Sequence, residues 1–156
     1  MEVFEELFCE SQGRPVVYRG KTVMLGDRLN VGVGTSHLMF RIVSTSSEWR
    51  QGFTLDCNGV LDFGDGEEVS SGVHIWSDTA PSEAMFRCRP KDGILRVWNI
   101  WDTGNGCAES GHHGAAMWAE QIPGGWRYHC NDGHPDDDFN DIVFEILILS
   151  RTRIGT

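Results

Sequence analysis

The side chains with the clearest capacity for chemistry lie near the C-terminus, in residues 131–141. This segment holds five aspartates and two asparagines, namely Asp132, Asp136, Asp137, Asp138, Asp141, Asn131 and Asn140. Like charges at this spacing repel one another, so a folded loop that keeps them together is expected to contain a cation. Calcium fits best because it accepts about 6–8 oxygen ligands in irregular geometry, whereas magnesium requires a stricter octahedron. The alternative is a solvated acidic turn without a metal.

The spacing within this segment predicts the ligands. Aspartate or asparagine alternates with another residue from Asp136 through Asp138 to Asn140, as oxygen ligands do in calcium loops. The predicted metal ligands are Asp132, Asp136, Asp138, Asn140 and Asp141. Phe139 is expected to anchor the loop to the core. The strand expected at 142–150 is apolar on both faces, which is typical of a central strand and would hold the loop rigidly.

The acidic segment also carries a resemblance to known families. Residues 136–141 read Asp-Asp-Asp-Phe-Asn-Asp and precede an apolar strand. They resemble the calcium loop of the two-calcium bacterial lectins that bind fucose and mannose, and a signature of calcium-binding β-sandwich domains in bacterial surface proteins. In the lectins, sugar hydroxyls coordinate the paired calcium ions directly. The resemblance implies that Asp136, Asp138, Asn140 and Asp141 bind metal, and that Asp132 stands where the lectins have a further acidic ligand.

A second polar segment, residues 102–114, is rich in glycine and long for a connection within a compact domain. Such loops often bind ligands. Its side chains with oxygen atoms, together with one aspartate of the acidic segment, are candidate ligand-binding groups: Asp102, Asn105, Glu109 and Asp137. It lacks the pattern of a phosphate-binding loop.

The chain has six tryptophans, more than a core of this size requires. An exposed indole is a good platform for the apolar face of a sugar ring. Trp98 and Trp101 have opposite parity on one expected strand, so they should point to opposite faces, and we count both as candidate ligand-binding residues. Trp118 and Trp126 flank the turn 122–125 and are expected to lie across from each other.

The fold class follows from short extended runs separated by glycine, proline and aspartate. Strands are predicted at 16–19, 21–25, 29–33, 37–43, 48–56, 60–63, 69–77, 84–89, 94–101, 115–121, 126–130 and 142–150. Turns are expected at 64–66 and at Lys91-Asp92-Gly93. This pattern predicts one all-β domain over 1–156, an antiparallel, jelly-roll-like β-sandwich. Residues 1–13 are either a short amphipathic helix or an irregular arm.

The composition of the chain limits the classes of partner that it is expected to bind. The net charge of −10 argues against nucleic acid and anionic membranes. No apolar run approaches the roughly 20 residues of a membrane span. The first ten residues carry four glutamates where a signal peptide would be basic and then apolar, so we expect cytoplasmic synthesis, with residence there or non-standard export. The five cysteines form no Cys-x-x-Cys pair and are expected to be mainly buried thiols. The alternative is that they form one or two disulfides.

Together these patterns predict a calcium-dependent, lectin-like carbohydrate-binding module and not an enzyme. One alternative is a structural or adhesion β-sandwich whose calcium only rigidifies a loop and whose partner is a protein. Another is a glycoside hydrolase, which needs two carboxylates roughly 5–10 Å apart, but the sequence singles out no such pair. An exposed sheet edge would suit a homo-oligomer, yet no residue specifies one.

Overall fold

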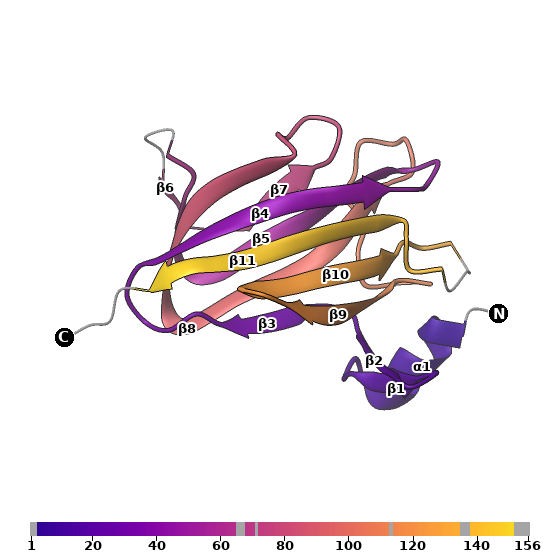
Figure 1. Ribbon diagram of the computed structural model, residues 1–156. Coiled ribbons are helices and arrows are strands. Elements are labelled where there is room, and N and C mark those ends of the chain that lie inside the picture. The colour runs from indigo at the N-terminus through magenta and orange to yellow at the C-terminus, as the bar shows by residue number, and fades with distance from the viewer. Residues whose placement is uncertain (1–2, 65–67, 71, 113, 135–137, 152–156) are drawn as a thin grey trace.

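The computed structural model shows an all-β protein with one short N-terminal helix (Figure 1). It describes residues 3–64, 68–70, 72–112, 114–134 and 138–151. The elements are α1 (Val3–Ser11), β1 (Val16–Tyr18), β2 (Lys21–Met24), β3 (Asp27–Asn30), β4 (Ser36–Thr45), β5 (Arg50–Asp62), β6 (Glu68–Val69), β7 (Val73–Trp76), β8 (Glu83–Asp102), β9 (Ala116–Ile122), β10 (Gly125–Asn131) and β11 (Ile142–Arg151). No helix within the described ranges is long and apolar enough to cross a membrane.

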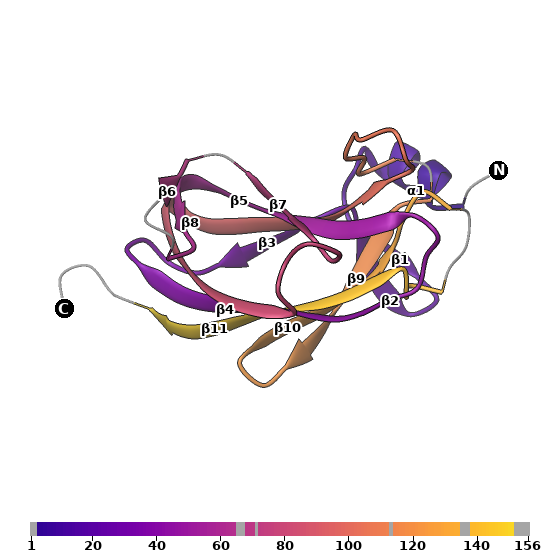
Figure 2. The ribbon, with the colours of Figure 1, turned by 90° about the horizontal axis from the view of Figure 1, so that it is seen from above.

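Hydrogen bonds join the strands into an antiparallel sheet that folds over into two layers. One layer runs in the order β1-β2-β9-β10-β11-β4 and ends on the first half of β8; we call it the front layer. The other layer, the rear layer, holds β3, the second half of β8, β5 and β7. Figure 2 shows the two layers edge-on. The predicted antiparallel all-β fold is confirmed, and so is the helical reading of the N-terminus.

The long strand β8 joins the layers and corrects one prediction. Lys91-Asp92-Gly93 is not a turn between two strands; it is an irregularity inside β8, where the register with β5 shifts. Gly93 adopts a φ of 76°, and its carbonyl accepts hydrogen bonds from the amides of Val31 and Gly32. The segment therefore bends the strand as a β-bulge does, without reversing it. The two strands expected at 48–56 and 60–63 are likewise one strand, β5.

Two predictions about the C-terminal half are confirmed. β11 lies between β10 and β4, so it is a central strand of the front layer. Pro123 and Gly124 form the turn of the β9–β10 hairpin, with Ile122 paired to Gly125. Gly124 has a φ of 83°, which a type II turn requires at its third position and which glycine adopts readily.

The main core fills the space between the layers. Alternating side chains of the long strands point inward, and the rings of Phe53 and Phe144 stack with their centroids 4.1 Å apart. Cys57, Cys88 and Cys130 are buried in the same core, and all five cysteines are free thiols. Burial raises the pKa of the Cys130 thiol, which therefore stays protonated and serves as a small apolar side chain.

A second, smaller core closes one end of the sandwich. Phe4 and Phe8 of α1 pack with Val23, Ala116 and Phe139. Phe139 comes from the acidic loop, so its predicted anchoring role is confirmed. It has a φ of 54°, an unfavourable conformation for a bulky residue, and its amide donates to Asn131 Oδ1 at 2.7 Å. Ring burial and this hydrogen bond hold the loop in its conformation.

Candidate functional site

The acidic loop lies at the end of the sandwich that α1 covers (Figure 1). The β4–β5 connection meets it there, since the Trp49 ring stacks on His134 with centroids 4.5 Å apart. Gly133 lies against the buried ring of Trp101, where an added Cβ would come within 3.1 Å. The loop is thus fixed by segments from distant parts of the chain.

Asp132 is fully buried, and protein donors satisfy its carboxylate. Oδ2 accepts from Ser47 Oγ at 2.7 Å and from Gln51 Nε2 at 2.9 Å, and Oδ1 accepts from the His134 amide at 2.9 Å. All three donors are neutral groups. A buried carboxylate costs little when it accepts several hydrogen bonds, so Asp132 ties the acidic loop to β5.

Asp141 and Asn131 hold the two ends of the loop together. Asp141 is buried, and its Oδ2 accepts from the Asp132 amide at 2.9 Å. The Asp141 amide donates to the Cys130 carbonyl, and Asn99 Nδ2 donates to the Asn131 carbonyl at 2.8 Å. The loop therefore enters and leaves the sheet through a buried, hydrogen-bonded neck.

Buried polar residues concentrate around this neck: Gln51, Asn99, Asn131, Asp132 and Asp141. The amide nitrogen of Gln51 donates to Asp132 and to the Trp49 carbonyl, which fixes the direction of the side chain. Its carbonyl oxygen, Oε1, is buried and has no hydrogen-bond partner among the described residues. Oε1 is bonded to the same amide carbon as Nε2, which donates to Asp132, so Oε1 also lies close to Asp132. A hydrogen-bond donor or a cation at this place would satisfy Oε1.

The predicted metal ligands occupy different environments. Asp132 and Asp141 are buried, Asp138 and Asn140 are exposed, and Asp136 lies outside the described residues, as does Asp137. Histidine, cysteine, aspartate and glutamate side chains form no group of three or more that would hold a metal in the part of the chain that the structure describes.

The glycine-rich segment uses its polar groups to fold itself. Asp102 Oδ1 accepts from the amides of Gly104, Asn105 and Gly106 at 2.8, 3.1 and 3.2 Å. Asn105 Oδ1 accepts from the Cys107 amide at 3.1 Å. Such local hydrogen bonds are typical of Asx turns, so these two side chains shape the loop.

Glu109 returns the glycine-rich segment to the sheet. Its backbone forms an isolated bridge with Trp101, and its carboxylate lies 3.6 Å from His112 Nε2. Within the segment, Glu109 and His112 are therefore both held close to the buried Trp101, whose ring centroid is 5.3 Å from that of His112.

The tryptophans differ from several expectations. Trp101 is buried, which removes its ring from any ligand, whereas Trp98 is half-buried on the outer surface of the rear layer, beside Thr54. Trp118 and Trp126 do not lie across from each other, because Trp118 pairs with His129 and Trp126 pairs with Gln121. Trp126 and His129 are three positions apart on β10 and so point to opposite faces, and Trp118 shares the face of its partner His129. The two indoles therefore project from opposite faces of the hairpin.

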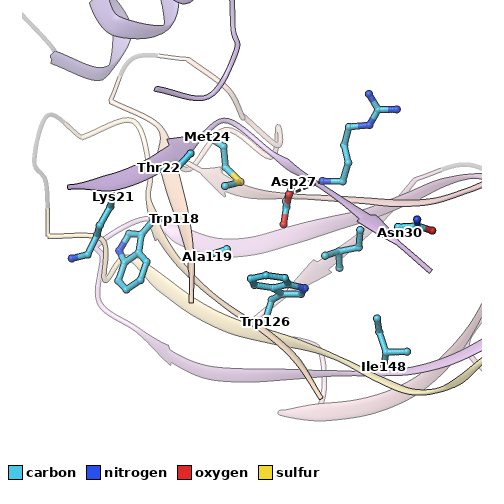
Figure 3. A pocket seen from close by; sticks show the side chains of 11 residues that line it. Lys21, Thr22, Met24, Asp27, Asn30, Trp118, Ala119, Trp126 and Ile148 are labelled. Carbon is cyan, nitrogen blue, oxygen red and sulfur yellow. Dashed lines mark hydrogen bonds between the residues drawn. The ribbon is translucent and has the colours of Figure 1, made fainter. Parts of the chain in front are cut away.

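A groove of about 660 Å³ opens on the side of the sandwich and was not predicted (Figure 3). It lies between β9 of the front layer and β3 of the rear layer. β9 pairs with β2 only through Trp118 and Met117, and β3 pairs with β8 alone. The side of the sandwich is therefore open where these two strand edges approach each other.

The groove combines apolar rings with polar side chains. Figure 3 shows Asp27 and Asn30 across from Trp126 and Ile148, with Trp118 at one end. Trp126 packs on the main core with part of its indole exposed.

The Trp118 ring is held from both sides at its end of the groove. It stacks on His129 with centroids 4.2 Å apart, and Lys21 Nζ lies 4.4 Å from its centroid. A cation over an indole face is attracted by the ring, so these contacts fix the orientation of Trp118.

Asp27 is held in a defined orientation within the groove. Its Oδ2 accepts from the Tyr128 hydroxyl at 2.7 Å, and its Oδ1 accepts from the Arg28 amide at 2.8 Å. Burial, together with the nearby Asp27 charge, raises the pKa of Tyr128 far above its ordinary value, so the phenol remains a donor. Nothing in the sequence marks these residues, because β2 and β3 are short and their position opposite β9 is a tertiary feature.

The acidic loop lies away from the Trp126 end of the groove, whereas the Trp118 end is closer to it, because Trp118 pairs with His129, two residues from Asn131. Asn131 and Trp126 lie at opposite ends of β10, five residues apart. At about 3.4 Å per residue, this corresponds to roughly 17 Å along the strand. A small ligand beside Trp126 therefore lies well away from the neck of the acidic loop.

Comparisons with protein-family models, curated proteins and solved structures found no match for this chain.

Proposed function

We propose that this protein is a carbohydrate-binding β-sandwich module whose glycan lies in the groove between β9 and β3. The observation that carries the proposal is the partly exposed Trp126 indole facing Asp27 and Asn30 across an open groove. Sugar rings present an apolar face and a rim of hydroxyls, and sites for them combine an aromatic surface with a few oriented polar groups. Asp27 is held by Tyr128 and by its neighbouring amide, so it accepts a sugar hydroxyl without reorganising.

The second part of the proposal is that calcium binds at the acidic loop, through Asp132, Asp136, Asp138, Asn140 and Asp141, and stabilises the loop. The charge of the loop supports this, and so does the buried Gln51 oxygen beside Asp132. The separation of roughly 17 Å along β10 favours a calcium that does not touch the glycan. In this respect the proposal departs from the lectins that the loop resembles.

A binding module is proposed in preference to a glycoside hydrolase because the groove offers too few carboxylates for catalysis. Glycoside hydrolysis uses two carboxyl groups flanking the scissile bond. Among the described residues that line the groove, Asp27 alone carries a carboxylate, and both of its oxygens already accept hydrogen bonds.

The test is glycan-array binding of the protein and of Trp126→Leu. Leucine keeps an apolar side chain against the core but removes the flat ring. We expect binding to a defined set of glycans, weakened about fivefold or more in Trp126→Leu, because an aromatic platform is worth roughly 1 kcal/mol or more beyond its buried area. Trp98→Leu is the matched control, since Trp98 is half-buried on the rear layer, and it should bind as the unaltered protein does.

Absence of binding to every glycan would contradict the proposal and favour the structural or adhesion module. Equal losses in Trp126→Leu and Trp98→Leu would place the glycan elsewhere. Loss of binding on chelation, with the fold intact, would mean that the metal and the sugar share one site.

A further inference from the structure

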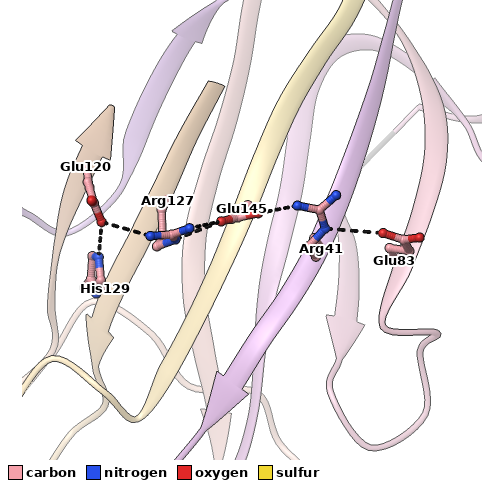
Figure 4. A network of polar contacts seen from close by, with 6 residues as sticks. All are labelled: Arg41, Glu83, Glu120, Arg127, His129 and Glu145. Atoms are coloured by element: carbon pink, nitrogen blue, oxygen red, sulfur yellow. Dashed lines mark hydrogen bonds and ion pairs between the residues drawn. The ribbon is translucent and has the colours of Figure 1, made fainter. Parts of the chain in front are cut away.

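The outer surface of the front layer carries a row of alternating charges that crosses five strands (Figure 4). In order from β9 to β8 the row is Glu120, Arg127, Glu145, Arg41 and Glu83, and each residue is the register partner of the next. Arg127 lies 3.5 Å from Glu120 and 2.8 Å from Glu145, and Arg41 lies 3.0 Å from Glu145 and 3.3 Å from Glu83. The row is thus ordered. Glu145 at its centre is buried between the two arginines, so the charges exposed to a partner are those of Arg127 and Arg41 and, at the two ends, Glu120 and Glu83.

An apolar row runs beside it, displaced two residues along each strand. Its members are Ile122, Gly125, Leu147, Met39 and Met85, again partners in register. Met85 is 59% exposed, and Leu149 nearby is 47% exposed. Exposed methionine and leucine close together on one sheet face are typical of an interaction surface.

We infer that this face of the front layer is a docking surface for a second copy of the chain. The pattern of charge on this face indicates that the partner is a second copy, because the face is complementary to itself. A two-fold axis parallel to the strands and between β11 and β4 would lay β11 over the partner's β4 and β10 over the partner's β8. Arg127 would then face the partner's exposed Glu83, whereas the buried Glu145 does not contact the partner. Because the contact is isologous, the Arg127–Glu83 pair occurs twice.

The apolar row is complementary under the same axis. Leu147 would lie against the partner's Met39. The protruding Met85 would lie over the partner's Gly125, which has no side chain to obstruct it. One axis thus pairs opposite charges in one row and a protruding side chain with a gap in the next. This inference is independent of the glycan groove.

The size of the face suits a weak or moderate dimer. The strands of this face have seven to ten residues in β9, β10, β11 and β4, roughly 24–34 Å each, so four to five strands at about 4.8 Å spacing offer on the order of 600 Å² per partner. Standard interfaces bury about 800 Å² per partner. We therefore expect association that depends on protein concentration.

The experiment is sedimentation velocity of the full chain from micromolar to about millimolar concentration. We expect a monomer–dimer equilibrium. Met85→Lys places a charge over the partner's Gly125, and Glu83→Lys opposes the partner's Arg127 with a like charge. Each should weaken association about tenfold or more. The changed side chains are largely exposed, so both variants should melt as the unaltered protein does.

Matched controls lie outside the two rows. Glu68→Lys reverses the charge of an exposed ion pair with Arg89, and Val33→Lys adds a charge at an exposed apolar residue. Both should dimerise normally. A monomer at every concentration would overturn the inference, and so would a dimer that either Met85→Lys or Glu83→Lys leaves unchanged.

Discussion

At the scale of the residue, identical side chains in the acidic loop have different roles because their surroundings differ. Asp132 is enclosed by the donors of Ser47, Gln51 and His134, whereas Asp138 projects into solvent. The burial of Asp132 makes it an anchor of the fold whether or not a cation binds nearby. Asp138, which is exposed, forms no such anchor to the residues that the structure describes.

Asp132→Ala is expected to lower the free energy of unfolding by about 3 kcal/mol in the presence of chelator, because it leaves the half-buried Ser47 donor and the buried Gln51 donor without their acceptor. Asp138→Ala is the matched control and should change it by less than about 0.5 kcal/mol. Urea unfolding measures both. Equal stability of the two variants would contradict the anchoring role.

At the scale of the element, cross-strand pairs organise the outer surface of the front layer. His129 Nε2 lies 3.0 Å from Glu120 Oε1 across the β9–β10 hairpin, and Arg127 approaches the same carboxylate. The hydrogen bond from His129, followed by the Arg127 charge, holds the pKa of Glu120 below its ordinary 4.5. The hairpin is therefore most stable when Glu120 is ionised.

The sign of the pH dependence follows from that lowered pKa. The stabilisation from Glu120 is complete above its unfolded pKa of about 4.5 and is lost as the pH falls through the lower folded pKa. Glu120→Gln should therefore melt with a shallower dependence on acid below about pH 4.5 than the unaltered protein. Thermal melting across this range measures the difference. Parallel melting curves for the two proteins would contradict the assignment.

At the scale of the whole molecule, like charge opposes the compact state. The net charge is −10, and five aspartates lie within eleven residues of sequence, 131–141. A cation that binds only the folded protein would relieve this repulsion and stabilise the fold by mass action. Thermal melting is therefore a direct test of the proposed calcium.

We expect calcium, and not magnesium, to raise the melting temperature by about 5–10 °C at a hundredfold excess over its dissociation constant. Asp138→Ala should melt as the unaltered protein does in chelator but lose most of this rise. If no divalent cation changes the melting temperature, the loop is a solvated turn held by its own hydrogen bonds.

The sequence by itself determined the all-β class, the central position of β11, the Pro123-Gly124 hairpin and the anchoring of the loop by Phe139. Each depends on a local pattern: alternation of apolar residues, turn chemistry, or an aromatic residue among polar ones. The local pattern wrongly predicted a turn at Gly93. The conformation there depends on hydrogen bonds that the Gly93 carbonyl accepts from the amides of Val31 and Gly32, more than sixty residues earlier in the chain.

Only the tertiary structure decided what the aspartates do and where a ligand would lie. Asp132 is separated by 85 residues from Ser47 and by 81 from Gln51, so its burial and its donors depend on how β5 meets the end of β10. The groove likewise exists because the edges of β3 and β9, in different layers, approach each other on the open side of the sandwich. Strand periodicity specifies which face of a strand is buried, but it does not specify which distant strand packs against it.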